Sequence, residues 1–369
     1  LNRNRPLWEV HVIDGLDQIE GIPAGCFAVL LKIHHALMDG KTAMEVFNSL
    51  HKVMNEGSHH LKAVEADFDR FVEYESDVRL PKILASAALN NIYKTGNIIR
   101  MVGRALGMYS SIMRGIESRE IKQLHKNKTR FNGVVSPRRV VDRVNIPLGD
   151  IHKIRKKVDG ATVTDVALSV IGGGLRRYLQ AKAEMPEDSL VAAVPLSVKI
   201  TEESELVAGN EKISLANVAL RTDVKDPLER LKKVRKESQA GRAYANAVGK
   251  NLVSDAMGCM YPGLVAWGVK TAVESGVLDK FPPASNTIIA NLAGSTEPLY
   301  FCGAKMVDAF GMAPLMPNTG LFHTMSSTWQ SLTIAFTADR QKMEDPAFYA
   351  QCLRESFDEL YAAALPEKA

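Results

Sequence analysis

Two adjacent histidines followed by an aspartate and a glycine form the stretch of this sequence best suited to chemistry. They lie in the run His34-His35-Ala36-Leu37-Met38-Asp39-Gly40. A histidine side chain titrates near neutral pH and can take a proton from an alcohol. An aspartate four residues after the second histidine can fix the backbone of the same tight loop. The spacing therefore indicates a general-base site for acyl transfer.

The context of the pair, rather than the pair itself, supports this interpretation. A second pair, His59-His60, lies in a polar stretch without an aspartate, and we interpret it as a solvated loop. The first pair ends an apolar run at 26–34 and leads into a helix predicted from about Lys41. A chance pair at a strand end is the alternative, with one ring directed inward and the other outward. No metal is expected, because two adjacent histidines with one aspartate are poor zinc spacing.

Strands and helices alternate loosely along the chain, without a regular strand–helix–strand order. Periodicity predicts strands at 7–16, 26–34, 139–147, 190–198, 213–221, 285–292, 304–311, 320–327 and 331–337. Helices are predicted from about Lys41, at 89–116, from Thr162, at 226–245, at 247–276, and from Asp345 or Pro346 to about 363. We expect an α+β protein with an N-terminal domain at 1–116, a linker at 117–139 and a C-terminal domain at 140–369.

Positive charge is concentrated between Lys94 and Arg143, where twelve Lys and Arg residues face three acidic ones. This excess predicts an anionic partner such as a phospholipid surface, a nucleotide-bearing cofactor or a nucleic acid. Part of it flanks the apolar stripe of the predicted helix at 89–116. That stripe either packs on the protein body, as most amphipathic helices do, or lies on a lipid surface.

The composition is that of a soluble globular protein large enough for two cores. The chain has 369 residues, of which 46% are hydrophobic, and no apolar run of the roughly twenty residues that a membrane span needs. Four cysteines lie far apart and predict neither a disulfide framework nor a zinc motif. The chain begins at Leu1 rather than at a methionine, so we expect the first part of the N-terminal domain to be missing from it.

The run from His34 to Gly40 matches the HHxxxDG motif of CoA-dependent acyltransferases with the chloramphenicol-acetyltransferase-like fold. More narrowly, the chain resembles the bacterial wax ester synthase/acyl-CoA:diacylglycerol acyltransferase family. The resemblance spans nearly the whole chain and includes Pro6-Leu7-Trp8, Ser136-Pro137-Arg138-Arg139, Thr164-Asp165, Val194–Val198, Gly209-Asn210, Asn291–Gly294 and Leu332–Arg340. Two positions depart from the family pattern: Thr164 replaces an asparagine, and Ala290–Gly294 replaces an SNVPG-like segment.

The resemblance implies two related domains, each a mixed sheet with packed helices, and an active site at their interface. His35 would be the general base, and His34 would support it. Asp39 would hold the loop in a structural role, and Gly40 would allow its tight exit. The acyl group would pass directly from acyl-CoA to a fatty alcohol or a diacylglycerol, without an acyl-enzyme and without a bound cofactor.

Other residues are weaker candidates for binding the substrates. Pro6, Leu7 and Trp8 could line an acyl channel, although a tryptophan beside a strand is more often core. Asn132 and Ser197 are candidate donors to an oxyanion, although polar loop residues usually bond locally. Thr164 and Asp165 are added because they occupy the family's Asn-Asp position.

The family resemblance also predicts where the protein acts and which alternatives remain. We expect a cytoplasmic enzyme associated peripherally with the inner membrane or with lipid inclusions. One alternative is a catalytically idle lipid- or membrane-binding protein on the same scaffold, and another is a condensation-type acyltransferase with a different acceptor. A nucleic-acid partner is not expected, because few aromatic residues interrupt the basic stretch.

Overall fold

The computed structural model describes residues 6–19, 21–34, 37, 40–51, 127–197, 213–247, 271, 275, 283, 285–292 and 294–366. The chain divides into two compact units. Unit 1 comprises Leu1–Leu61, Leu292–Ala309 and Ser327–Trp329, and unit 2 comprises Lys62–Asn291, Phe310–Ser326 and Gln330–Ala369. Two short segments of the expected C-terminal domain therefore group with the N-terminal residues.

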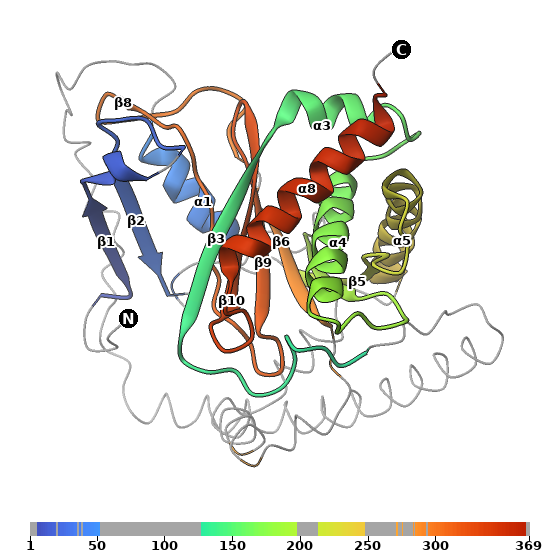
Figure 1. Cartoon of the computed structure of the whole chain (residues 1–369). Coiled ribbons are helices and arrows are strands. Elements are labelled where there is room, and N and C mark those ends of the chain that lie inside the picture. The colour runs from blue at the N-terminus through green and yellow to red at the C-terminus, as the bar shows by residue number, and fades with distance from the viewer. Residues whose placement is uncertain are drawn as a thin grey trace, which may run out of the picture. The chain divides into compact units, whose positions relative to one another are not determined.

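Unit 1 is built around an antiparallel pair of strands, β1 (Trp8–Ile13) and β2 (Ala28–Ile33) (Figure 1). Trp8, Val10 and Val12 lie opposite Ile33, Leu31 and Val29, so the alternating sequence places these six apolar side chains on one face. The short helix η1 (Leu16–Gln18) lies in the connection between the strands, and α1 (Gly40–Ser49) follows β2. The two-residue strands β7 (Tyr300–Phe301) and β8 (Ala304–Lys305) form a hairpin.

Unit 2 contains a six-stranded mixed sheet in the order β3-β10-β9-β6-β4-β5. Its strands are β3 (Arg139–Pro147), β4 (Val191–Ser197), β5 (Ile213–Ala219), β6 (Thr287–Leu292), β9 (Leu321–Ser327) and β10 (Ser331–Asp339). β3 pairs antiparallel with β10 and β4 antiparallel with β5, whereas β4 and β6 are parallel. The sheet is therefore of the mixed type expected for an α+β protein.

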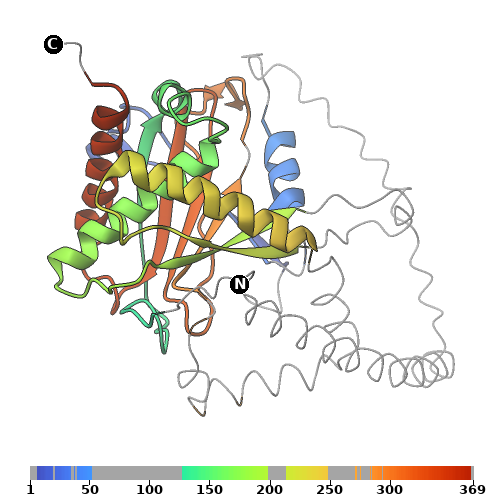
Figure 2. The same cartoon turned by 90° about the vertical axis from the view of Figure 1, so that its right-hand side faces the viewer.

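Helices cover one face of this sheet, as Figures 1 and 2 show. They are α3 (Leu148–Arg155), α4 (Val163–Ala181), α5 (Pro227–Ala247) and α8 (Pro346–Ala364). The core lies between the helices and the sheet, where residues such as Val170, Leu175, Ile334 and Phe336 are fully buried. Burial of this apolar surface is the main favourable contribution to folding of the unit.

Three consecutive glycines let α4 approach its neighbours closely. A Cβ on Gly172 would lie 2.2 Å from the backbone oxygen of Leu220, and one on Gly174 would lie 2.6 Å from the Leu353 side chain. A Cβ on Gly173 would lie 2.1 Å from the Oγ of Ser356 and 2.6 Å from the Arg230 guanidinium. Gly172 therefore faces the turn after β5, whereas Gly173 and Gly174 both face α8, so α4 is packed closely on more than one side.

Most of the strands and helices predicted from the sequence that fall on described residues are present. The strand predicted at 304–311 is wrong beyond Lys305, because the chain carries Gly311, Pro314 and Pro317 further on and forms no ladder there. The helix α3 and the strand β7 were not predicted. The helix predicted at 89–116 lies outside the described residues, as does all of the one at 247–276 except Ala247, Thr271 and Ser275.

Within the described part of the chain, no helix is long and apolar enough to cross a membrane. Cys26, Cys302 and Cys352 are free thiols there, and no cluster of His, Cys, Asp and Glu could hold a metal ion.

Candidate active site

The first histidine of the motif directly follows β2, and α1 begins at Gly40. The amide of His34 donates to the carbonyl of Leu7 at 2.8 Å, and the carbonyl of His34 accepts from the amide of Leu37 at 2.8 Å. Both backbone groups of His34 are therefore fixed. The predicted strand before the motif and the predicted helix after it are present, whereas His35 and Asp39 lie outside the described residues, so their roles remain predictions.

The bond from His34 to Leu7 brings two predicted groups together, the histidine loop and the Pro6-Leu7-Trp8 segment. Trp8 begins β1 opposite Ile33, the last residue before the histidines. Its side chain is 53% exposed, so within unit 1 it lies on an open apolar face rather than in a core. Pro6 is exposed and Leu7 is half-buried.

Thr164 and Asp165 lie in the first turn of α4, as their sequence context predicts. The Oγ1 of Thr162 accepts from the amide of Asp165 at 3.1 Å, and the Oδ2 of Asp165 accepts from the amide of Thr162 at 2.9 Å. This reciprocal pair is a capping box, which satisfies two backbone donors at the helix start. Asp165 is buried, and its Oδ1 lies 3.6 Å from the guanidinium of Arg242 on α5. The carboxylate therefore has a structural role that needs no substrate.

The two positions that depart from the family pattern are in contact. The side-chain amide of Asn291, near the end of β6, donates to the Oγ1 of Thr164 at 3.4 Å. Ser197 is the last residue of β4, which runs parallel to β6 with Ala193 opposite Ile288. Thr164, Asp165 and Ser197 therefore belong to the same end of the unit 2 sheet. The side chain of Ser197 lies outside the described atoms.

Asn132 lies at the other end of that sheet. Its amide nitrogen donates to the carbonyls of Ser285 at 3.2 Å and Asn318 at 2.9 Å, residues that precede β6 and β9. Its oxygen accepts from the amide of Thr129 at 3.1 Å and from the side-chain amide of Asn286 at 3.1 Å. Both N–H donors of this buried amide are occupied, so an oxyanion would have to displace one of these bonds. These hydrogen bonds account for Asn132 without a substrate, and its role as an oxyanion donor remains a prediction.

A buried carboxylate joins two other segments of the family resemblance. Asp339, at the end of β10, accepts hydrogen bonds from the amide and the hydroxyl of Ser136, both at 2.6 Å. Burial alone would raise the pKa of Asp339, but the bonds from Ser136 and Gln341 and the nearby charge of Lys342 outweigh it and lower the pKa. The segment before β3 is thereby fastened to the end of β10.

His323 is a buried histidine that the sequence analysis did not single out. Its Nδ1 lies 2.9 Å from the Oγ1 of Thr287, and its Nε2 lies 2.8 Å from the hydroxyl of Tyr349. Desolvation lowers the pKa of His323 to about 3, so the ring is neutral. The period of two along the predicted strand places His323 on the core face with Leu321 and Met325, and this signal could have found it.

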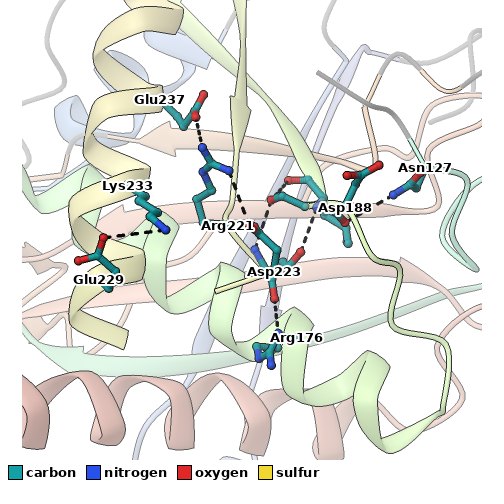
Figure 3. A network of polar contacts seen from close by, with 11 residues as sticks. Asn127, Arg176, Asp188, Arg221, Asp223, Glu229, Lys233 and Glu237 are labelled. Atoms are coloured by element: carbon teal, nitrogen blue, oxygen red, sulfur yellow. Dashed lines mark hydrogen bonds and ion pairs between the residues drawn. The ribbon is translucent and has the colours of Figure 1, made fainter. Parts of the chain in front are cut away.

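A second polar network that sequence reasoning missed surrounds the turn after β5 (Figure 3). Arg221 has a positive φ of 54°, and its guanidinium lies 2.6 Å from Glu237 of α5. Arg176 of α4 donates to the carbonyl of Thr222 at 2.7 Å, and the Thr222 hydroxyl accepts from the amide of Leu190 at 3.0 Å. The network fixes α4, α5 and the start of β4 to one turn, so it supports the scaffold rather than a reaction.

Family models identify the chain along most of its length. The model of the wax ester synthase/diacylglycerol acyltransferase catalytic domain matches residues 1–167, and that of the WS/DGAT C-terminal domain matches residues 208–361. The chain belongs to the wax ester synthase/diacylglycerol acyltransferase family. Membership makes it an acyltransferase and confirms the resemblance seen in its motifs.

Relatives and a solved structure agree with this membership. The chain is similar to a putative diacylglycerol O-acyltransferase of Mycobacterium tuberculosis, with 25% identity over 98% of this chain and 68% of the relative. It is 27% identical to the probable diacylglycerol O-acyltransferase Tgs4 of the same species, over 99% of this chain and 75% of the relative.

Among solved structures, the wax ester synthase/diacylglycerol acyltransferase of Marinobacter aquaeolei VT8 matches with a TM-score of 0.64 and 22% identity. The match covers 99% of this chain and 73% of that one. It shows a shared fold, and the predicted α+β class is confirmed.

Proposed function

We propose that this acyltransferase moves a fatty acyl group from acyl-CoA to the hydroxyl of a long-chain alcohol or a diacylglycerol, with His35 as the general base. The observation that carries the proposal is the hydrogen bond from the His34 amide to the Leu7 carbonyl. It fixes the backbone of His34, the residue before His35, against the Pro6-Leu7-Trp8 segment. Family membership supplies the reaction class.

The proposed reaction is a direct transfer between two substrates. A ring nitrogen of His35 takes the proton of the acceptor hydroxyl as its oxygen attacks the carbonyl carbon of the thioester. The tetrahedral intermediate then collapses, the carbon–sulfur bond breaks, and the CoA thiolate takes the proton from the imidazolium. The products are an ester and free CoA. The mechanism uses acyl-CoA as a co-substrate and requires no bound cofactor.

The residues on either side of His35 have distinct proposed roles. The amide and carbonyl of His34 are both bonded within unit 1, so His34 would act through the backbone and its own packing. Asp39 directly precedes α1, where a carboxylate interacts favourably with the helix dipole. Gly40 begins the helix without a side chain that would crowd the loop.

Other residues are proposed to contact the substrates. The exposed face around Trp8 is a candidate wall for an acyl chain, together with Pro6 and Leu7. Thr164, Asp165 and Ser197 share one end of the unit 2 sheet and are candidate contacts to the substrates. Because both acceptors are lipids, we also propose peripheral association with the inner membrane or lipid inclusions in the cytoplasm.

The test compares wild type with His35→Ala and a matched control, His59→Ala, in the histidine pair that we interpret as a solvated loop. The proteins are incubated with palmitoyl-CoA and either hexadecanol or diolein, and CoA release and ester formation are followed. His35→Ala should lower kcat by about 10²- to 10⁴-fold, because general-base catalysis contributes that much. His59→Ala should match wild type. Equal activity in His35→Ala and wild type would contradict the general-base role of His35.

A further inference from the structure

Two loops of unit 2 lie side by side at the end of the sheet where β3, β6 and β9 begin. The amide of Gly133 donates to the Oδ1 of Asn318 at 2.7 Å, and the amide of Gly320 donates to the carbonyl of Phe131 at 2.6 Å. Asn318 has a positive φ of 61°, which turns its chain sharply. The loops are thus fixed to each other and to the sheet, so their tips form a preformed surface.

The tips of these loops expose apolar side chains. Val134 is 74% exposed and Met316 is 54% exposed. The chain leading to Met316 also exposes Phe310 and Met312, and Val141 is exposed on the neighbouring edge strand β3. The hydroxyl of Thr324 on β9 donates to the carbonyl of Gly311 at 2.6 Å, which holds this chain on the sheet. Five exposed apolar side chains on fixed backbone are more than isolated surface residues.

Arginines lie beside this apolar surface, at Phe310 and at the start of β3. The Arg143 guanidinium lies 5.3 Å from the centre of the Phe310 ring. Arg138 and Arg340 are exposed and adjacent, because the amide of Arg340 donates to the carbonyl of Arg138 at 3.1 Å. Arg139 is exposed and donates to the carbonyls of Ser136 and Arg138.

The arginines before β3 and after β10 have no carboxylate partner in the described structure. Among the described residues, Arg138, Arg139 and Arg340 form no ion pair. Asp339 beside them is buried and bonded to Ser136. Three adjacent cations repel one another, and an anionic partner would offset that repulsion.

We propose that this arginine-rimmed patch binds the surface of an anionic phospholipid membrane. Its apolar members are Val134, Val141, Phe310, Met312 and Met316, and its rim is Arg138, Arg139, Arg143 and Arg340. Apolar tips would enter the acyl boundary while the guanidinium groups contact lipid phosphates. The choice of a membrane rests on the proposed function, because both acceptors are lipids. Binding itself is measured without turnover, so either idea can fail alone.

The experiment measures co-sedimentation of the full chain with phosphatidylcholine vesicles, with and without phosphatidylglycerol. Arg138→Gln/Arg340→Gln should weaken binding to the anionic vesicles roughly 30-fold, since each basic residue near the surface contributes about fivefold. The matched control, Lys232→Gln/Lys236→Gln on α5, removes the same net charge from another surface and should bind like wild type. Binding of wild type should also weaken with salt.

The second part of the experiment replaces two apolar residues of the patch. Val134→Ser/Met316→Ser should weaken vesicle binding about tenfold. Its control is Val10→Ser/Val12→Ser, on the exposed face of β1 in unit 1, which should not weaken it. Thermal unfolding checks that all four double variants are folded. Turnover on detergent-dispersed acceptor should equal that of wild type in the three double variants of unit 2, and its absence in wild type would refute the proposed function while leaving the vesicle result intact.

Several outcomes would contradict the proposal that this patch binds a membrane. Equal losses in the arginine and lysine pairs would show that binding follows net charge alone. If only Val10→Ser/Val12→Ser weakened vesicle binding, the membrane contact would lie on unit 1. A dimer that Val134→Ser/Met316→Ser dissociates, with vesicle binding unchanged, would make the patch an interface between copies. A raised KM for acyl-CoA in the arginine pair, with vesicle binding unchanged, would assign these cations to the CoA phosphates.

Discussion

At the scale of single residues, His323 shows how a core fixes a protonation state. Its two ring nitrogens face the hydroxyls of Thr287 and Tyr349, and no charged group is hydrogen-bonded to it. Desolvation therefore acts alone and lowers the pKa of His323 to about 3. In the unfolded chain the same imidazole titrates near pH 6.5. Between these two values the unfolded state binds a proton that the folded state does not.

This difference predicts a loss of stability in acid. As pH falls below about 6.5, the unfolded state binds more protons, and the free energy of unfolding decreases until about pH 3. At pH 5 the contribution of His323 is a loss of about 2 kcal/mol, from one and a half units at 1.36 kcal/mol each. Urea unfolding at pH 7 and pH 5 measures it. His323→Gln, which cannot titrate, should lose about 2 kcal/mol less than wild type over this interval, and an equal loss would contradict the prediction.

Two roles are possible for Asp165, a structural one in the helix cap and one in binding the substrate. Asp165→Ala should lower the free energy of unfolding by about 1 kcal/mol through loss of the capping box. Thr162→Ala is the matched control, since it removes the same cap but is not a predicted substrate contact. Urea unfolding and steady-state kinetics on both variants separate the roles. A drop in kcat/KM confined to Asp165→Ala would establish a substrate role, and equal kinetics would leave only the cap.

Which polar residues could be found from the sequence depended on how local their partners are. The capping box is visible because Thr162 and Asp165 are three residues apart. Asn132 has one local partner, Thr129, but its other partners Ser285, Asn286 and Asn318 are more than 150 residues away, and no local pattern points to them. The histidine motif itself was recognisable from spacing, whereas its bond to Leu7 depends on the pairing of two strands.

At the scale of elements, the strands of unit 2 were readable because burial imposes a pattern on them. β3 and β10 alternate or run apolar, and their predicted and observed positions nearly coincide. The helix α3 was missed because it has eight residues and begins directly after a strand at Pro147. The chain at 306–311 is apolar enough for a strand but has no partner strand in a ladder, a tertiary fact that periodicity does not contain.

The glycines of α4 lead to a prediction about how closely this helix packs. Gly172→Ala should destabilise the protein by about 1–3 kcal/mol, because the new Cβ would lie 2.2 Å from the rigid backbone oxygen of Leu220. Gly149→Ala in α3 is the matched control. No atom lies within 4 Å of its Cβ position, so the better helix propensity of alanine should stabilise by up to about 1 kcal/mol. Thermal and urea unfolding should show opposite signs, and a stabilising Gly172→Ala would contradict the close approach.

At the scale of the whole molecule, the compact units are not continuous in sequence. Leu292–Ala309 and Ser327–Trp329 group with residues near the N-terminus, although both flank strands of unit 2. The composition of residues 117–139 predicts a domain boundary there. Composition does not show that a later segment of the chain packs with the N-terminal residues. Residues 127–139, placed in the predicted linker, are instead bonded to the unit 2 sheet through Asn132 and Ser136.

The place of residues 127–139 leads to a prediction about fragments. A fragment of residues 127–369 keeps fully buried Phe131, the bonds of Asn132 and the Ser136–Asp339 pair. A fragment of 140–369, cut at the predicted domain boundary, loses all of them and leaves the Asp339 carboxylate without its two hydrogen bonds from Ser136. The shorter fragment should be less stable by at least about 3 kcal/mol, the cost of removing one buried phenylalanine.

Urea unfolding followed by near-ultraviolet circular dichroism measures the difference between the two fragments. The 127–369 fragment with Asn132→Ala should fall between them, because it loses the amide bonds but keeps Phe131 and Ser136. Equal stability of the two fragments would restore 117–139 as a linker. If neither fragment folds, unit 2 requires the N-terminal residues with which Leu292–Ala309 and Ser327–Trp329 group. The cooperative folding unit would then be the whole acyltransferase rather than either compact unit.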